Sequence, residues 1–377
     1  MFKFAKLINV SKVNNNKYYE MEQTSDSEFI IKYGRVGAAP QKKSYPIGRW
    51  YTIYNDKIRK GYTDITQHIR IQEEIKIQHA NNEVQELFDV LSSYAKKQMT
   101  ENYYVDAKSV TKSQLDTAKN YLEKAYYSNN KEDINNNLLE VYRVIPRKMK
   151  NVNDYLYKDQ NQFDELYNSE IQLLDNLICQ SNISETISLS DNLGLQIEMC
   201  NSDDLQIIHN LISSEQNCNK NYNKYKKAFK VKSIDSEQRF QNYINENKNK
   251  KIQHVWHGSR APNWLSILKN GLKIRPSNAY YSGSAYGDGI YGSTCFDKSY
   301  GYTGSNKDTF MAIMKFHVGN QYEYNGWNTG NSFSFTYNEL KKRGYDSTFV
   351  KPGGRLLNNE YVIYNENQTT IAYLLWI

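Results

Sequence analysis

One stretch, residues 254–302, concentrates the side chains that could form a small-molecule site. It contains a His-Gly-Ser turn that begins at His257, the glycine-rich segment 287–292, and a spaced pair of tyrosines that ends at Tyr302. An acidic partner, Glu360, follows much later. Aromatic faces hold flat rings, and glycines let backbone groups approach a ligand closely. The stretch therefore predicts a pocket that binds a nucleotide by stacking and hydrogen bonding.

Three other kinds of chemistry fit this stretch poorly. Segment 287–292 matches G-x-G-x-x-G, but neither an apolar strand before it nor an amphipathic helix after it is indicated, as a dinucleotide-binding fold requires. Ser259 does not lie in the G-x-S-x-G turn of a hydrolase. His254 and His257 lack a third metal ligand, and the four cysteines are scattered without a C-x-x-C pair. We therefore expect no metal and no bound cofactor.

The composition is that of an ordinary soluble protein. The 377 residues are enough for two or three domains, and 39% of them are hydrophobic. We find neither a signal-peptide core at the N-terminus nor a run long enough for a membrane span. The scattered cysteines fit a reducing compartment. The sequence predicts a soluble, intracellular protein with no membrane partner.

Positive charge is concentrated near the N-terminus. Residues 1–80 contain 14 Lys and Arg against 8 Asp and Glu, which accounts for six of the seven net positive charges. Aromatic residues are interleaved with these cations, as phosphate contact with base or sugar stacking requires. A solvated cationic surface is the alternative. The candidate contacts to nucleic acid are Tyr33, Arg35, Lys42, Lys43 and Arg49.

Three patterns of secondary structure position these residues. Strands are predicted at 17–22, 28–33 and near 42–45, with a helix at 50–59, so the N-terminal part is a small antiparallel sheet with one helix. Residues 82–185 contain no glycine and repeat apolar residues at helical spacing, with Ser113 as the expected cap of a second helix. This predicts an all-helical bundle. From about residue 186 strands (194–199, 225–233, 254–257) alternate with helices (203–212, 238–245).

The first two parts resemble known domains. The run Tyr33-Gly-Arg-Val-Gly37, followed by a basic helix, resembles a WGR domain with Tyr33 in place of the tryptophan that names it. That resemblance implies binding to nucleic-acid ends or breaks. The helical segments resemble, in order, the regulatory domain that precedes the catalytic domain of DNA-dependent poly(ADP-ribose) polymerases. The bundle is therefore expected to be regulatory, with a spacer or a dimerisation module as alternatives.

The third part resembles the ADP-ribosyltransferase catalytic domain of the poly(ADP-ribose) polymerase family. Five motifs carry the resemblance, namely WHGSR (256–260), GLKI (271–274), GDGIY (287–291), KSYGY (298–302) and NEYVIY (359–364). The implied fold class is multidomain α+β. It comprises an antiparallel-sheet WGR domain (1–80), an all-α helical regulatory domain (82–185) and a mixed α/β catalytic domain (186–377).

The resemblance also implies a role for each site residue. His257, Tyr291 and Glu360 are the expected catalytic set: His257 binds a ribose hydroxyl of NAD⁺, Tyr291 closes the nicotinamide pocket, and Glu360 orients the attacking acceptor. A carboxylate suits this position because the ribose develops oxocarbenium-like charge. The other expected contacts to NAD⁺ are Gly258, Ser259, Arg260, Lys273, Ser299 and Tyr302.

The expected activity is DNA-dependent transfer of ADP-ribose from NAD⁺ to protein acceptors, with the protein itself among them, in the nuclear response to DNA damage. NAD⁺ is then a consumed substrate, and DNA ends or nicks are the activators. A mono(ADP-ribosyl)transferase and a catalytically silent DNA-end-binding protein are the alternatives. Two departures from the family pattern, Gly292 and the small pair Ser284-Ala285, predict a looser nicotinamide pocket and altered docking of a growing polymer.

Overall fold

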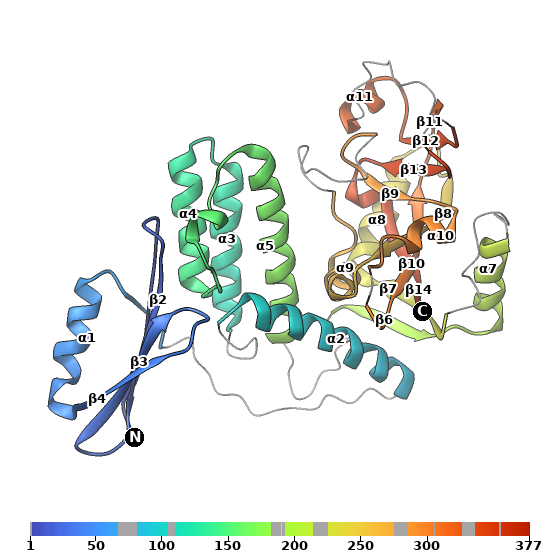
Figure 1. The fold of residues 1–377 in the computed structure, drawn as a ribbon. Coiled ribbons are helices and arrows are strands. Elements are labelled where there is room, and N and C mark those ends of the chain that lie inside the picture. The colour runs from blue at the N-terminus through green and yellow to red at the C-terminus, as the bar shows by residue number, and fades with distance from the viewer. Residues whose placement is uncertain are drawn as a thin grey trace. The chain divides into compact units, whose positions relative to one another are not determined.

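The computed structural model describes residues 2–66, 81–104, 110–181, 190, 193–213, 225–274, 286–304, 306–325, 336–353 and 356–377. The chain forms two compact units (Figure 1). One unit joins Met1–Ile75 with Lys96–Asn182, and the other joins Lys76–Ala95 with Ile183–Ile377.

The first unit begins with an antiparallel sheet of strand order β4-β3-β2-β1-β5. The strands are β1 (Phe4–Ser11), β2 (Asn15–Gln23), β3 (Glu28–Arg35), β4 (Gln41–Pro46) and β5 (Thr63–Asp64). Helix α1 (Trp50–Arg59), preceded by the 3₁₀ turn η1 (Ile47–Arg49), lies along one face (Figure 1), where Trp50 packs with strand residues such as Phe29 and Ile31. The predicted N-terminal sheet and helix are confirmed, and β1 and β5 are additional strands.

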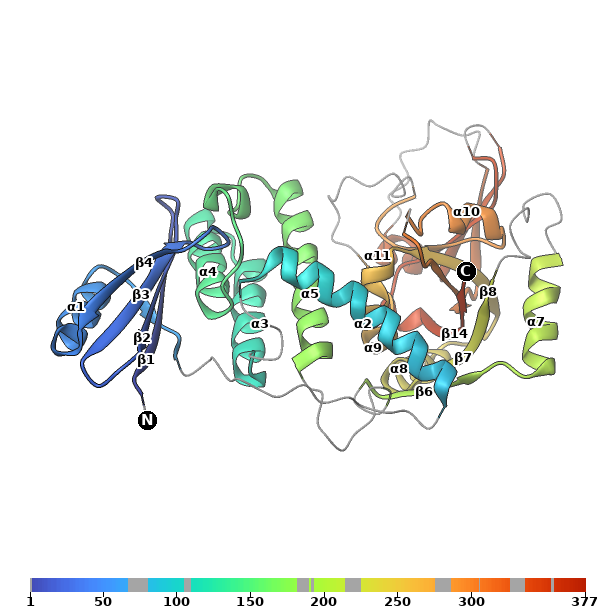
Figure 2. The ribbon, with the colours of Figure 1, turned by 60° about the horizontal axis from the view of Figure 1, so that its bottom comes forward.

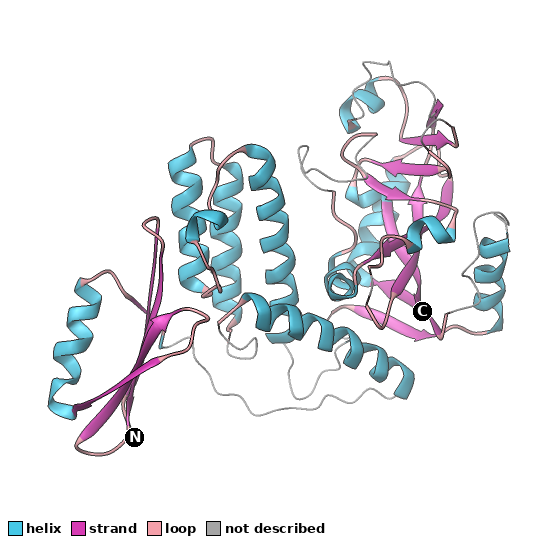
Figure 3. Cartoon of the chain, viewed as in Figure 1, coloured by secondary structure: helices cyan, strands magenta, loops and turns pink. Residues whose placement is uncertain are grey.

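Four helices follow the sheet in the sequence. They are α2 (Asn82–Asn102), α3 (Lys112–Tyr127), α4 (Lys131–Val144) and α5 (Gln160–Ser181), with the 3₁₀ turn η4 (Val152–Tyr155). The N-cap of helix α3 is Thr111 rather than the predicted Ser113, because the Thr111 hydroxyl and the Gln114 side chain form a reciprocal capping box. The helical periodicity of this region is confirmed (Figure 3).

These helices do not form a core of their own. Ile8, Val10 and Tyr18 from the sheet belong to the same buried cluster as Leu122 of α3 and Leu138 of α4. Alternation along a strand explains how the sheet can serve both α1 and the helices, because successive side chains point to opposite faces. The structure thus shows helices that share a core with the sheet, and a separate all-helical bundle is not shown.

Helix α2 belongs to both units, since its residues up to Ala95 group with the C-terminal part of the chain and the rest with the N-terminal part. The proposed division into three domains, with boundaries near residues 81 and 185, stays a prediction.

The second unit contains two sheets within its described residues (Figure 1), and Figure 2 shows the larger one from another side. The larger has the order β6-β7-β14-β10-β8, with β6 (Leu195–Met199), β7 (Lys227–Ser233), β14 (Thr369–Trp376), β10 (Phe310–His317) and β8 (Ile252–Ser259). The smaller has the order β11-β12-β13-β9, with β11 (Gln321–Asn325), β12 (Ser347–Lys351), β13 (Glu360–Ile363) and β9 (Ile290–Gly292). All eight residues of β14 are buried, as expected for a central strand covered on both faces.

Helices and 3₁₀ turns complete this unit. They are α7 (Ser202–Ser213), α8 (Ile234–Glu246), η7 (Ala261–Asn263), α9 (Trp264–Asn270), α10 (Phe296–Tyr300), α11 (Tyr337–Lys342) and η8 (Glu366–Gln368). The predicted mixture of strands and helices is confirmed. Among the described residues, none of the helices combines the length and the apolar character needed to cross a membrane.

Candidate active site

Three strands bring the predicted catalytic residues together. Strand β9 pairs with β13, with Tyr291 opposite Val362 and Gly292 opposite Tyr361. Just beyond β9, the backbone of Ser293 exchanges two hydrogen bonds with Trp256 of β8, with N···O distances of 2.7 and 3.3 Å. Residues 257, 291 and 360 therefore lie on neighbouring strands although more than 100 positions separate the first from the last.

A hydrogen bond fixes the ring of His257. Its Nδ1 lies 3.1 Å from the backbone oxygen of Tyr291. A carbonyl oxygen can only accept, so Nδ1 carries the proton in this contact. In the neutral ring Nε2 is then the unprotonated nitrogen, which accepts hydrogen bonds. In this form, Nε2 of His257 can accept a hydrogen bond from a ligand hydroxyl.

Tyr291 anchors the glycine-rich loop. Its hydroxyl donates to the Gly287 carbonyl oxygen at 2.6 Å and accepts from the Tyr286 backbone N–H at 3.1 Å. Burial raises the pKa of the Tyr291 phenol, so it stays protonated at neutral pH. The hydroxyl therefore holds the loop, and the ring is the part of Tyr291 that can line a pocket.

Glu360 is the first residue of β13 and is buried, with 8% of its surface exposed. Its Oε1 lies 2.7 Å from Nζ of Lys298 on α10. Burial lowers the pKa of Lys298, and the pair with Glu360 opposes that shift. Buried charges are retained when they are paired, and here each partner compensates the other.

Lys298 is a site residue that the sequence did not assign. The available signal was its place in the K-S-Y-G-Y motif, directly before Ser299. Motif resemblance assigned functions to Ser299 and Tyr302 only, and a lysine in a basic chain carries no further signal by itself.

Gly258 and Ser299 are in close contact. A Cβ atom at position 258 would overlap the backbone oxygen of Ser299, so only glycine fits there. The Ser299 hydroxyl is buried and donates to the Trp256 carbonyl oxygen at 3.0 Å. The proton of this hydroxyl is therefore used within the protein, and its oxygen can still accept from an amide N–H.

The structure leaves no open space at Gly292, and the expected loosening of the nicotinamide pocket there stays a prediction. A Cβ at this position would overlap Val255, and would lie 3.1 Å from Phe316. Val255 and Phe316 already fill the space that a side chain would occupy, so glycine at 292 is compensated by its neighbours. Ser284 and Ala285, the other departure, lie outside the described residues.

The remaining residues predicted to contact NAD⁺ are partly or largely exposed. Tyr302 is 48% exposed, so part of the residue is accessible to a ligand. Ser259 accepts a hydrogen bond on its hydroxyl at 3.0 Å from Asn263, and Arg260 is exposed. Lys273 is exposed, and its Nζ lies 2.7 Å from the carboxylate of Glu366. These residues are near-surface groups, in contrast to the buried Glu360.

The predicted nucleic-acid contacts separate onto two faces of the N-terminal sheet. Lys43 pairs with the buried Ile31 and thus lies on the face that carries α1. Its Nζ is 5.3 Å from the ring centre of Tyr45, and the Arg49 guanidinium is 5.4 Å from the same centre. Lys42 directly precedes Lys43 in the strand and therefore points to the other face of the sheet.

Arg35 is bound within the protein. Its guanidinium donates to the Asn14 side chain at 2.8 Å and to the backbone oxygens of Asn14, Met149 and Lys150. Tyr33 is half-buried, with its ring 5.7 Å from that of Tyr19. Contact between these two residues and nucleic acid stays a prediction, but Arg35 already has a structural use.

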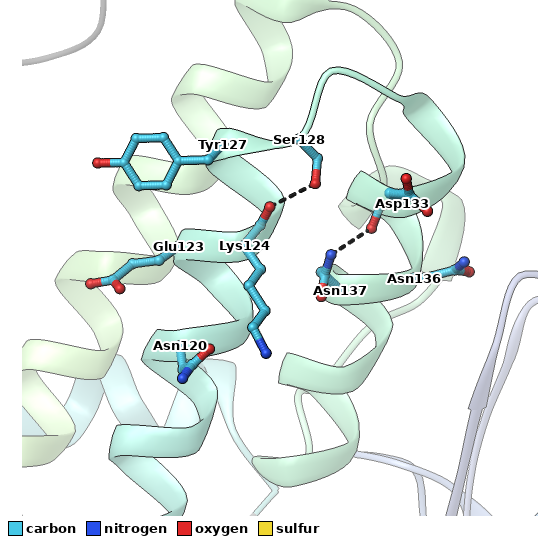
Figure 4. Close-up of a pocket in the computed structure, with 8 residues that line it drawn as sticks. All are labelled: Asn120, Glu123, Lys124, Tyr127, Ser128, Asp133, Asn136 and Asn137. Carbon is cyan, nitrogen blue, oxygen red and sulfur yellow. Dashed lines mark hydrogen bonds between the residues drawn. The ribbon is translucent and has the colours of Figure 1, made fainter.

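A polar hollow of about 630 Å³ lies elsewhere, between α3 and α4 (Figure 4). Its lining comprises Asn120, Glu123, Lys124, Tyr127, Ser128, Asp133, Asn136 and Asn137. None of the predicted site residues is among them, so this hollow is not the predicted site. Within the described part of the chain, His, Cys, Asp and Glu form no group of three that could hold a metal ion. Independence from metal stays a prediction.

Comparison with known proteins agrees with this geometry. Residues 202–377 match the model of the poly(ADP-ribose) polymerase catalytic domain, and residues 2–68 match the WGR domain. A putative poly [ADP-ribose] polymerase-like protein, 100L of Invertebrate iridescent virus 6, is 41% identical over 172 residues, which are 45% of this chain and 93% of the viral protein.

Two further relatives extend the comparison. Protein 101L of the same virus, which is uncharacterised, is 30% identical over 51% of this chain and 82% of its own length. Poly [ADP-ribose] polymerase 2 of Arabidopsis thaliana is 30% identical over 37% of this chain and 25% of its own length. The catalytic domain and these relatives define an NAD⁺ ADP-ribosyltransferase. The chain belongs to the poly(ADP-ribose) polymerase family.

Proposed function

We propose that this enzyme is a DNA-dependent poly(ADP-ribose) polymerase. It transfers ADP-ribose from NAD⁺ to protein acceptors, including itself, and acts in the nuclear response to DNA damage. The observation that carries the proposal is the buried Glu360, whose carboxylate lies 2.7 Å from Nζ of Lys298. Its strand β13 pairs with β9, which carries Tyr291, and the backbone oxygen of Tyr291 accepts a hydrogen bond from the His257 ring. A buried carboxylate beside an ammonium group suits a reaction in which positive charge develops on the substrate.

The reaction breaks the bond between ribose C1′ and the pyridinium nitrogen of NAD⁺. The bonding electron pair moves to nicotinamide, which leaves as a neutral molecule, and positive charge develops on the ribose. An acceptor oxygen then bonds to C1′, and its proton is released to solvent. Glycoside cleavage has the same kind of transition state, and a carboxylate stabilises it there. NAD⁺ is consumed as a substrate, and the scheme uses neither a metal nor a bound cofactor.

Each predicted site residue has a role in this scheme. His257 accepts a hydrogen bond on Nε2 from a hydroxyl of the nicotinamide ribose. The backbone of Gly258 and the Ser299 oxygen bind the nicotinamide amide. The ring of Tyr302 stacks on the nicotinamide ring, and the Tyr291 ring closes the opposite side. Glu360 binds a ribose hydroxyl and orients the acceptor.

The adenosine side of NAD⁺ is assigned to residues nearer the surface. Ser259 and Arg260 follow Gly258 directly, and Lys273 exchanges its ion pair with Glu366 for the substrate. An exposed pair of this kind is worth about 1 kcal/mol or less, so opening it costs little.

We assign nucleic-acid binding to the N-terminal sheet and its helix. Lys43 and Arg49 lie near the ring of Tyr45 on the face that carries α1, where two cations can contact phosphates beside an aromatic surface. The helical segment between this part and the catalytic domain is assigned a regulatory role. DNA can activate the enzyme through it only if DNA prefers the active state.

The product of the reaction tests the proposal. The full-length protein is incubated with NAD⁺ labelled on the adenylate phosphate, with and without a nicked duplex, and separated on a denaturing gel. A DNA-dependent ladder of labelled protein supports a polymerase. A single labelled band would show mono(ADP-ribosyl) transfer instead, and no label with either sample would show a silent DNA-binding protein.

A further inference from the structure

The start of strand β13 is held by side chains on the side that faces β9, where its backbone pairing with that strand ends. Backbone pairing between β13 and β9 runs from Ile363 to Tyr361, which is opposite Gly292. Glu360 lies just beyond this last pair, although on its other side it pairs with Val350 of β12. The end of a ladder frays unless other groups hold it. On the β9 side, the position of the Glu360 carboxylate therefore depends on what fixes the chain directly before it.

Asn359 supplies that connection to the segment after β9. Its Oδ1 accepts from the Thr294 backbone N–H at 3.2 Å and from the Ser293 hydroxyl at 3.1 Å, and its Nδ2 donates to the Thr294 hydroxyl at 2.7 Å. The Ser293 hydroxyl also lies 2.8 Å from the backbone oxygen of Asn359. These contacts continue the link between the two chain segments beyond the last backbone pair.

Lys298 connects the same two residues. Its Nζ lies 3.3 Å from the Asn359 backbone oxygen and 2.7 Å from Oε1 of Glu360. The segment that Asn359 grips is also joined to β8, because Ser293 bridges to Trp256. One amide side chain therefore links the strand that begins with Glu360 to the two other strands of the site.

We propose that Asn359 is the positioning residue of this enzyme: its amide, bound to Thr294 and Ser293, holds Glu360 in the orientation that transfer requires. Asn359 acts through Glu360 and does not itself contact the substrate. The inference rests on the proposed role of Glu360, and it adds a requirement that the role alone does not contain. Side chains that hold a reacting group in place affect turnover more than binding, because misplacement raises the barrier to reaction.

The test compares turnover with binding in the full-length protein activated by a nicked duplex. Asn359→Ala is expected to lower kcat for nicotinamide release by about 10- to 100-fold, the range that small misplacements of reacting groups produce. Affinity for free nicotinamide, measured by calorimetry, should stay within about twofold, since its contacts are assigned to other residues. Thr294→Val should show a smaller loss of the same kind, and Thr294→Ser, which keeps the hydroxyl, should restore kcat.

Asn365→Ala is the matched control, because Asn365 follows the other end of β13 and accepts from the Asn367 backbone N–H at 2.9 Å. It should change neither quantity. An unchanged kcat in Asn359→Ala would overturn the inference, and so would a parallel loss of kcat and nicotinamide affinity, which would indicate a collapsed pocket. Glu360→Gln is assayed alongside: if its kcat is unchanged, the proposed role of Glu360 fails, whereas loss in Glu360→Gln alone rejects only the role of Asn359.

Discussion

The candidate active site and the basic N-terminal sheet differ in how firmly their functional side chains are held. Around the buried Glu360, hydrogen bonds to backbone oxygens hold the half-buried His257 and Tyr291, and an ion pair holds Lys298. On the sheet, the cations lie at the surface, and neighbouring residues such as Lys42 and Lys43 point to opposite faces. The difference matches the two tasks, because bond cleavage needs fixed groups whereas phosphate contact tolerates mobile ones.

The largest effect is expected at the buried pair. Glu360→Gln keeps the shape of the side chain, removes a charge-assisted hydrogen bond and leaves Lys298 without its partner. We expect the rate of transfer to fall by about 10- to 150-fold, which corresponds to about 1.5–3 kcal/mol. Label transfer from NAD⁺ measures it. Glu323→Gln, at an exposed pair with Lys351, is the control and should behave as wild type. Wild-type transfer by Glu360→Gln would remove the main support for the site.

A disrupted helical core should act in the opposite direction. Leu122 is fully buried in the core that the helices share with the sheet. If the helical segment restrains the catalytic domain, Leu122→Asp should raise activity without DNA by at least about fivefold, the lower range of typical coupling energies, and shrink the stimulation by DNA.

Tyr127→Asp, at an exposed position of the same helix, is the control for this experiment and should change neither activity. Because the core is shared, Leu122→Asp should also weaken DNA binding. Basal activity that stays at the wild-type level in the Leu122→Asp protein would assign the helices to a spacer or a dimer interface.

The pH dependence of activity is a further test of the active site. Burial lowers the pKa of Lys298, so its ammonium loses its proton at a lower pH than that of an exposed lysine. Activity that needs the ion pair should therefore decline on the alkaline side below the ordinary lysine pKa. In Lys298→Arg the guanidinium stays protonated, and this decline should disappear.

The expected effect of rising pH on stability has the opposite sign to its expected effect on activity. A folded pKa below the unfolded value means that the folded state binds fewer protons between the two pKa values, so the contribution of Lys298 to stability rises with pH there. Activity that falls together with the free energy of unfolding would point to general unfolding instead. If activity declined at the same alkaline pH in wild type and in Lys298→Arg, the protonation of Lys298 would not control turnover.

The smallest effect is expected on the sheet. Reversing Lys43 to Glu should lower the slope of log affinity for a nicked duplex against log salt by about one unit for each phosphate that the protein no longer binds. Lys42→Glu tests the opposite face and should change the slope less. Lys12→Glu, at an exposed pair with Glu132, is the control. A larger change for Lys42 than for Lys43 would move the interface to the other face.

The sequence predicted the elements well where periodicity was strong, as in helices α3 to α5. Its spaced motifs also singled out His257, Tyr291 and Glu360, which the structure places on neighbouring strands and whose catalytic roles stay predictions. It could not show that Ile8 and Tyr18 share a core with the helices, because the partner of a buried face is set by tertiary packing. Lys298 and Asn359 were equally out of reach, since their contacts join segments about 60 residues apart.

Gly292 is another position at which the sequence alone could not show how the space is filled. A motif comparison registers the missing side chain, but only the structure shows Val255 and Phe316 in its place. Likewise, a count of cations includes Arg35, whereas its bonds to Asn14, Met149 and Lys150 show that it serves the fold.

The central claim is that the site built around Glu360 cleaves NAD⁺ and transfers its ADP-ribose. The most direct measurement follows NAD⁺ labelled separately on nicotinamide and on the adenylate phosphate, in the presence of the full-length protein and a nicked duplex. We expect one free nicotinamide for each ADP-ribose that becomes bound to protein, with both signals lost together in Glu360→Gln. Nicotinamide release without protein-bound label, or label transfer that persists in Glu360→Gln, would contradict the claim.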